Sequence, residues 1–225
     1  AGVVGDWFFT LDPDGVDPVL KVHSLGECYR KGNPHYDQRS TVPAIVDVTT
    51  GAVVNNDYHD LTTELETAWK KYFRPDAPDL YPEALHDDID ALNDIIYADV
   101  NLAVNLAALV TSQKDYEFYY NKVFDRLDWL EKRLSSRRYL FGDTITDPDI
   151  RLYVTLARFD LVFYQKYYVN KKRLVDYPNL WNYAKDLYSH PAFGKNTDFD
   201  SMRKRFYYVD HTPFEDFPRI VPKGP

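Results

Sequence analysis

Two short segments of the sequence carry groups suited to holding a peptide-like ligand. In the first, Thr41-Val42-Pro43, a proline stands where an apolar run begins, and a proline cannot donate to a sheet ladder. One interpretation is an edge strand whose Val42 backbone pairs with the ligand by strand addition, with a cis Val42–Pro43 bond. The alternative is an ordinary turn-and-edge proline.

The second segment, Asn55-Asn56-Asp57-Tyr58, lies where a strand is expected to give way to a helix. Backbone N–H groups at a helix start favour an anion, and the Asp57 carboxylate could hold an ammonium group. A zwitterionic ligand would suit both. Asparagine and aspartate are also favoured helix caps, so plain capping is the alternative.

Cys28 is the only cysteine and therefore the only thiol that could act as a nucleophile. Reactive thiolates are favoured at helix N-termini or beside cations. Arg30 and Lys31 are close in sequence, but we expect Cys28 late in a helix over residues 18–31, where the helix dipole disfavours a thiolate. We therefore expect Cys28 to pack in a core. A single cysteine also excludes an internal disulfide and fits a reducing compartment.

Neither a metal site nor a phosphate-binding loop is predicted. A zinc site needs three or four ligands in suitable geometry, and the histidines show no i,i+4 pair and no cysteine partner. Asp12-Pro13-Asp14-Gly15 lacks the spacing of a calcium loop, and the nine glycines are scattered. The histidines are His23, His35, His59, His86, His190 and His211.

The composition narrows the class of protein. A formal charge of −8 argues against a general nucleic-acid binder, because phosphate binding needs a clustered basic surface. Nineteen Tyr, 13 Phe and four Trp supply rings that can line a cleft as well as a core. The sequence has no long apolar run that would span a membrane and no signal peptide. We expect a cytoplasmic protein without a nucleic-acid or membrane partner.

The elements that must position these residues divide at a proline-containing linker, Arg74-Pro75-Asp76-Ala77-Pro78. Before it we expect a helix, an antiparallel hairpin and a second helix capped by Asn56 or Asp57. After it, apolar residues recur at helical spacing. The expected segments are a helix at 18–31, strands at 42–48 and 52–54, a helix at 57–71, and helices at 85–104, 123–134, 147–161, 178–187 and 198–206.

This order predicts an α+β/α two-domain fold. A hairpin followed by a helix is the C-terminal half of a thioredoxin-like layer, so residues 1–75 form an incomplete layer of that type. Residues 76–225 form an all-helical domain. Thr146-Asp147-Pro148-Asp149 is a strong helix start within it, with a threonine cap, an acidic residue three positions on and a proline in the first turn.

A series of short motifs resembles the glutathionyl-hydroquinone reductases, the xi class of glutathione transferases. The motifs recur in the same order and extend over essentially the whole chain. They are Trp7-Phe8-Phe9, Asp37-Gln38-Arg39-Ser40-Thr41-Val42-Pro43, Val53-Val54-Asn55-Asn56, Asp79-Leu80-Tyr81-Pro82-Glu83, Gly142-Asp143, Asp149-Ile150-Arg151-Leu152-Tyr153, Arg158-Phe159-Asp160, Tyr177-Pro178-Asn179-Leu180-Trp181, Thr197-Asp198-Phe199-Asp200 and Val221-Pro222-Lys223-Gly224-Pro225.

The resemblance implies a two-domain glutathione-transferase fold that binds glutathione as co-substrate, needs no metal and forms a homodimer. In this family an active-site cysteine attacks the thioether sulfur of a glutathionyl-hydroquinone, and a second glutathione resolves the mixed disulfide. Trp7, Val42, Pro43 and Asp57 match glutathione-site positions, with Asp57 standing where the family has Glu. We place Tyr58 in the same site.

The chain also departs from the family pattern. The family's catalytic cysteine belongs to a Cys-Pro-Trp-Ala type segment upstream of Trp7, and the 225 residues contain none, so the catalytic residue is unassigned. Tyr58-His59 replaces Ser-Ser. Asn105 stands where the family has a tyrosine, and Phe163 occupies a second tyrosine position, followed by Tyr164. We therefore expect a remodelled electrophile pocket formed by these last three residues.

The leading hypothesis is a glutathione transferase family protein that carries out glutathione-dependent thiol transfer or reduction on a small aromatic electrophile. The alternative is a non-catalytic glutathione-transferase-like protein that binds a ligand or a partner. A third hypothesis is an enzyme of the superfamily with another electrophile. The residue at the family's upstream catalytic position discriminates among the three.

Overall fold

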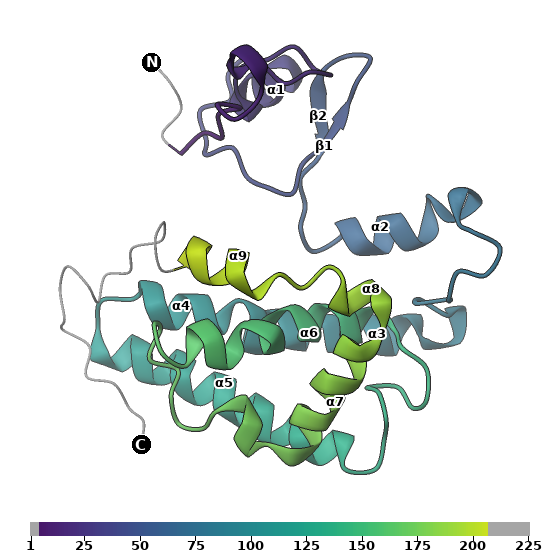
Figure 1. The fold of residues 1–225 in the computed structure, drawn as a ribbon, viewed down its shortest axis with the longest axis vertical. Coiled ribbons are helices and arrows are strands. Elements are labelled where there is room, and N and C mark those ends of the chain that lie inside the picture. Colours follow the sequence, from purple (N-terminus) through teal and green to yellow (C-terminus); the bar gives the residue numbers. More distant parts are fainter. Residues whose placement is uncertain (1–4, 207–225) are drawn as a thin grey trace. The chain divides into compact units, whose positions relative to one another are not determined.

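A two-stranded hairpin packed against one helix forms the centre of the first part of the chain (Figure 1). The structure is a computed structural model and describes residues 5–206. The chain divides into two units, Ala1–Ala77 and Pro78–Pro225. The terminal motif from Val221 to Pro225 lies outside the described residues. The first unit contains α1 (Leu25–Gly32), β1 (Ile45–Asp47), β2 (Ala52–Asn55) and α2 (Leu61–Thr67), with short 3₁₀ turns at Pro13–Gly15 and Lys70–Tyr72.

Helix α1 begins at Leu25, seven residues later than predicted. The Glu27 carboxylate accepts hydrogen bonds from the backbone N–H groups of His23 and Ser24, at 2.9 and 3.1 Å. Lys21 has a φ of +57°, a left-handed conformation that interrupts any helix. The predicted helix over 18–31 is therefore wrong in its first part, because local capping at Ser24 defines the start.

The hairpin predicted around Thr49-Thr50-Gly51 is confirmed. β1 and β2 are antiparallel, and Val46 pairs with Val53. The first strand is shorter than predicted, because Val42 and Pro43 lie in the irregular segment before it. Gly51 has a φ of +68° in the turn, a conformation that glycine adopts without steric cost.

Helix α2 begins at Leu61 instead of residue 57, and Asp60 is its N-cap. The Asp57 side chain accepts hydrogen bonds from the N–H groups of His59 and Asp60, at 2.8 and 3.3 Å. This aspartate therefore closes a turn before the helix, and the predicted cap at Asn56 or Asp57 is wrong. The helix ends at Thr67 and does not reach residue 71.

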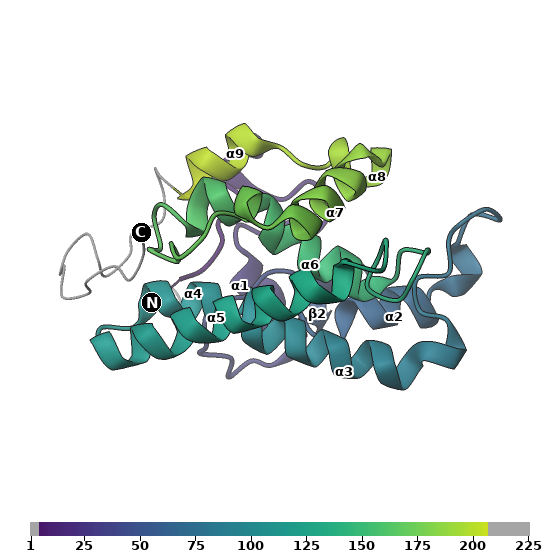
Figure 2. The ribbon, with the colours of Figure 1, turned by 90° about the horizontal axis from the view of Figure 1, so that it is seen from below.

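The second unit is helical within its described residues, as predicted. In Figure 2, α3, α4 and α5 lie on one side of α6, and α7, α8 and α9 lie on the other. The predicted helix over 85–104 is two helices joined by a π-helical turn. Within residues 5–206, no helix has the length and apolar character needed to cross a membrane. The helices are α3 (His86–Ile96), α4 (Ala103–Leu109), α5 (Gln113–Leu134), α6 (Asp147–Arg158), α7 (Pro178–Ser189), α8 (Pro191–Gly194) and α9 (Phe199–Lys204), with π-helical turns at Tyr97–Asn101 and Phe159–Phe163 and 3₁₀ turns at Glu83–Leu85 and Leu174–Asp176.

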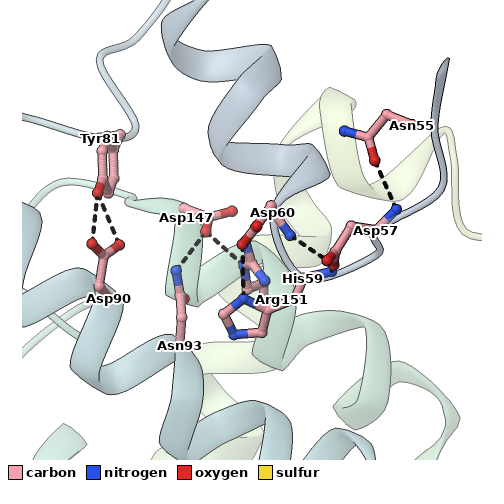
Figure 3. A network of polar contacts seen from close by, with 9 residues as sticks. All are labelled: Asn55, Asp57, His59, Asp60, Tyr81, Asp90, Asn93, Asp147 and Arg151. Atoms are coloured by element: carbon pink, nitrogen blue, oxygen red, sulfur yellow. Dashed lines mark hydrogen bonds and ion pairs between the residues drawn. The ribbon is translucent and has the colours of Figure 1, made fainter. Parts of the chain in front are cut away.

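Two buried carboxylates fix the start of α6, the central helix. Asp149 accepts hydrogen bonds from Thr146, through its N–H at 2.8 Å and its hydroxyl at 3.0 Å, and from the Leu140 N–H at 3.0 Å and the Tyr183 hydroxyl at 2.8 Å. The helix start predicted at Thr146 is therefore confirmed. Asp147 accepts from Arg151 at 2.6 Å and from the amide of Asn93 at 2.8 Å (Figure 3).

Candidate functional site

The segment before β1 presents backbone groups that no part of the described chain uses. The Val42–Pro43 bond is cis, as predicted. Val42 is 55% exposed, and within residues 5–206 no hydrogen bond engages its backbone. Thr41 holds this segment in place, because the Tyr29 hydroxyl donates to its carbonyl oxygen at 2.9 Å. An extended ligand could therefore pair with Val42 by strand addition.

The junction between β2 and α2 is joined to the same segment. The Asn56 amide donates to the Thr41 hydroxyl oxygen at 3.1 Å. The Asp57 N–H donates to the side-chain oxygen of Asn55 at 2.7 Å (Figure 3). The hydrogen bond between Asn56 and Thr41 links the residue before Val42 to the residue before Asp57.

The Asp57 carboxylate can accept hydrogen bonds beyond the two that close the turn before α2. Its Oδ1 atom accepts the two backbone N–H groups that close the turn, and the residue is exposed. A carboxylate has two oxygens and about four acceptor positions, so Oδ2 remains able to accept from an ammonium group. Tyr58, the next residue, is also exposed and lies in the same turn.

Trp7 is positioned at the beginning of α1. Its N–H donates to Asp6 Oδ1 at 2.8 Å, and its carbonyl accepts from the Leu25 N–H at 2.9 Å. The same Asp6 oxygen accepts from the Gly26 N–H at 2.8 Å. A Cβ atom at Gly26 would lie 2.4 Å from Asp6 Oδ2, so any larger residue at position 26 would displace the Asp6 carboxylate. Within the described residues, no hydrogen bond or ring contact joins Trp7 to Val42 or Asp57.

The electrostatics around Asp6 favour its ionised form. Burial alone would raise the pKa of the Asp6 carboxyl, but hydrogen bonds from Ser24, from the Gly26 N–H and from other neighbouring donors outweigh it, and the pKa is lowered. The carboxylate can therefore hold Trp7 and the start of α1 together at neutral pH.

Cys28 packs in the core of the first unit, as predicted, but for a different reason. It is the fourth of eight residues in α1, so the predicted late position, and the dipole argument built on it, are wrong. The side chain is completely buried with Val22, Leu25 and Tyr29, and burial raises the pKa of its thiol. Desolvation therefore disfavours the thiolate.

We expect Cys28 to react slowly with thiol reagents while the protein is folded. In Ellman's assay, the native chain should release far less chromophore per minute than the same chain in denaturant, because the thiol must first become exposed. In a form of the protein that carries the family's catalytic cysteine, Cys28→Ser should retain glutathione-dependent activity within about a factor of two. A loss of more than about tenfold, equal to about 1.4 kcal/mol of barrier, in a folded Cys28→Ser protein would contradict the assignment.

The residues predicted for the electrophile pocket lie in the second unit. Asn105, in α4, is half-buried, and its amide donates to the Asn101 carbonyl at 2.7 Å. Phe163 is buried and packs edge-on against Phe159 and Phe206. Tyr164 is half-buried and follows the π-helical turn.

Sequence reasoning missed a cavity of about 470 Å³ in the helical unit. Asn105, Phe163 and Tyr164 do not line it. Trp181 and Tyr188, which do, are seven residues apart in α7 and therefore share a helix face. That spacing of exposed rings was the available signal.

The described residues contain no group of three or more His, Cys, Asp or Glu side chains placed to hold a metal ion. The only thiol is the buried Cys28.

Comparisons with known proteins identify the family. Residues 113–186 match the family model described as the glutathione S-transferase C-terminal domain. The glutathionyl-hydroquinone reductase PcpF from Sphingobium chlorophenolicum is 33% identical over 97% of this chain and 69% of its own length. The glutathionyl-hydroquinone reductase YqjG from Escherichia coli is 36% identical over 85% of this chain, which spans 58% of that relative.

Solved structures agree with the sequence matches. A glutathione transferase from Gordonia bronchialis superposes with a TM-score of 0.86 at 45% identity, covering 97% of this chain and 68% of its own. The glutathione-bound structure of YqjG superposes with a TM-score of 0.83 at 34% identity, over 96% of this chain and 70% of its own. The partial thioredoxin-like layer followed by helices is therefore a glutathione-transferase fold. The chain belongs to the glutathionyl-hydroquinone reductase family, the xi class of glutathione transferases.

Proposed function

We propose that the unit formed by the first 75 residues or so binds glutathione and that the protein uses it to transfer thiols to, or reduce, a small aromatic electrophile. The observation that supports this proposal is the exposed Val42 backbone, which makes no hydrogen bond within residues 5–206, next to Thr41, whose side chain is hydrogen-bonded to Asn56, the residue before Asp57. The peptide-like part of glutathione would pair with Val42. Its γ-glutamyl ammonium would bind the Asp57 carboxylate, while Pro43, Trp7 and Tyr58 border the site.

The chemistry follows from sulfur exchange. An enzyme thiolate attacks the thioether sulfur of a glutathionyl-hydroquinone, and the carbon–sulfur bond electrons leave with the ring carbon, which takes up a proton to give the hydroquinone. The enzyme–glutathione mixed disulfide is then attacked by a second glutathione thiolate, releasing glutathione disulfide and the enzyme thiolate. The buried Cys28 is unsuited to this step, so the described residues supply binding and orientation.

We further infer that the protein is a cytoplasmic homodimer. Family resemblance supports the dimer, and the single cysteine among the 225 residues fits a reducing compartment. Light scattering on the purified protein gives its mass in solution. A monomer at micromolar concentration would overturn the homodimer.

The remodelled pocket should limit turnover of hydroquinone-type substrates. Asn105 replaces a phenol of the family, and a hydrogen bond to a charged oxygen contributes about 1.5–3 kcal/mol. In a form of the protein that carries the family's catalytic cysteine, we expect weak or absent glutathionyl-hydroquinone reductase activity. Asn105→Tyr should raise kcat/KM by roughly tenfold or more.

Steady-state kinetics on a model glutathionyl-hydroquinone tests this prediction. Asn182→Tyr, an exposed position in α7, is the matched control and should leave the rate unchanged. If the unmodified protein turned over this substrate as fast as the family's reductases do, the hypothesis of a remodelled pocket would be refuted. No turnover by any variant, combined with intact glutathione binding, would favour the non-catalytic alternative.

A further inference from the structure

We propose that Asp6 is a positioning residue for glutathione binding: its carboxylate fixes Trp7 against the first turn of α1, and α1 in turn holds the segment that carries Val42. This inference rests on the proposed function and adds to it a residue that acts on the ligand only through others. Asp6, Trp7, α1 and Val42 all belong to the first unit.

The Asp6 carboxylate fixes the Trp7 backbone relative to α1. Its Oδ1 atom accepts hydrogen bonds from the N–H groups of Trp7 and Gly26, both at 2.8 Å. The Trp7 carbonyl accepts from the Leu25 N–H at 2.9 Å. A carboxylate at the start of a helix is also favoured by the helix dipole. The Trp7 side chain is 38% exposed, so its ring stays open to a ligand while its backbone is held at both polar groups.

Helix α1, which packs against β2 (Figure 1), extends this link to the segment before β1. Tyr29 is buried in α1, and its hydroxyl donates to the Thr41 carbonyl at 2.9 Å. The Tyr36 ring stacks on Tyr29 with the ring centres 4.6 Å apart, and the Tyr36 hydroxyl donates to the Arg39 carbonyl at 2.7 Å. A displacement of α1 would therefore move the backbone next to Val42.

The Asp6 segment also adjoins residues 39–40 directly. A Cβ atom at Gly5 would lie 3.1 Å from Cγ of Arg39, so the Arg39 side chain passes close to the Gly5 backbone. Ser40 is completely buried, and its hydroxyl makes no hydrogen bond of ordinary geometry within residues 5–206. Burial alone would raise the pKa of the Asp6 carboxyl, but neighbouring donors lower it, and Ser40 is one of them. Asp6 therefore faces a residue only two positions before Val42.

The close approach of Asp6 to Gly26 offers a way to move the carboxylate without removing it. The three atoms nearest to a Cβ atom at Gly26 all belong to the Asp6 carboxyl group, at 2.4 to 2.9 Å. Alanine forms helices better than glycine does. Gly26→Ala should therefore displace the carboxylate while leaving α1 itself intact.

Calorimetric titration of the 225-residue chain with glutathione tests the positioning role. In Asp6→Ala, the N–H groups of Trp7 and Gly26 lose their acceptor, and glutathione should bind roughly tenfold more weakly. Asp6→Asn keeps an Oδ1 acceptor for both groups and should restore the affinity to within about threefold of the unmodified chain.

Asp47→Ala is the matched control, because Asp47 is a second carboxylate of the same unit that accepts a backbone N–H, that of Thr49 at 2.8 Å. It should lower the midpoint of thermal unfolding, as Asp6→Ala does, yet leave the glutathione affinity within about twofold. This comparison separates a residue that positions the glutathione site from one that only stabilises the unit.

A double-mutant cycle tests the same link by a second route. Gly26→Ala should weaken glutathione about as much as Asp6→Ala does. Added to Asp6→Ala, it should have no further effect, because the group that its Cβ atom displaces is then gone. If Asp6→Ala does not fold, Gly26→Ala decides alone, and unchanged affinity in that variant would overturn the proposal.

The outcomes separate this inference from the proposed function. Unchanged glutathione affinity in a folded Asp6→Ala protein, or equal weakening in Asp6→Ala and Asp47→Ala, would overturn the positioning role and leave the proposed function standing. Undetectable binding of glutathione by the unmodified chain would overturn both.

Discussion

Asp149→Ala should destabilise the second unit by about 4 kcal/mol, a large share of the stability of an ordinary domain. The Asp149 carboxylate caps α6 and accepts from four buried donors of Thr146, Leu140 and Tyr183. Loss of a cap costs about 0.5–2 kcal/mol. Each buried donor left without an acceptor costs about 1–3 kcal/mol, less where the structure can relax.

Urea unfolding followed by circular dichroism gives this free energy. Asp143→Ala removes a nearby but exposed carboxylate and should change the unfolding free energy by less than about 0.5 kcal/mol. If Asp149→Ala cost less than about 1 kcal/mol, α6 would not depend on this cap, and the assignment of Asp149 as a residue that fixes the start of α6 would be wrong.

Arg151→Met should destabilise the same unit by about 3–5 kcal/mol, because among the described side chains it leaves the buried Asp147 charge with only the Asn93 amide as its partner. The ion pair is almost completely buried, with side-chain exposures of 7% for Arg151 and 1% for Asp147. Adding Asp147→Leu removes the orphaned charge and should restore part of the lost stability, because the buried Asn93 amide then lacks its acceptor.

An exposed ion pair supplies the matched control for Arg151→Met. Arg203 and Asp200 are 2.7 Å apart in α9 and open to solvent, and such pairs contribute about 0–1 kcal/mol. Arg203→Met should therefore have a small effect in the same urea experiment. If Arg151→Met and Arg203→Met lowered the free energy of unfolding equally, burial of the Arg151–Asp147 ion pair would not explain its contribution to stability.

Much of the helical unit could be predicted from the sequence because its signals are local, although the helix expected at 123–134 begins ten residues earlier, at Gln113. The Thr146 cap with Asp149 and the regular apolar spacing in α5 each specify an element without long-range information. The π-helical turn at Tyr97–Asn101 could not be predicted in the same way. It adds residues to a turn without breaking the apolar stripe, so periodicity alone reads the segment as one helix.

In the first unit, both helices begin later than predicted, because side-chain hydrogen bonds close turns ahead of them. Asp57 and Glu27 are both polar residues near helix starts, and sequence alone did not indicate which turn each would close. The link between the segments that carry Val42 and Asp57 is a hydrogen bond between Asn56 and Thr41, fifteen residues apart. Such tertiary links carry no periodic signal. The resemblance pointed to these positions, and the structure supplies the link between them.

Glutathione titration of Asp57→Asn tests the central claim most directly. Asparagine keeps a side-chain oxygen that can accept from the His59 N–H, so the turn should survive while the charge is lost. A charge-assisted hydrogen bond contributes about 1.5–3 kcal/mol, so the 225-residue chain should bind glutathione, and Asp57→Asn should bind it roughly 10- to 100-fold more weakly. Asp76→Asn, an exposed residue of the linker, should bind as the unmodified chain does. Undetectable binding by the unmodified chain, or equal affinity in Asp57→Asn, would contradict the account.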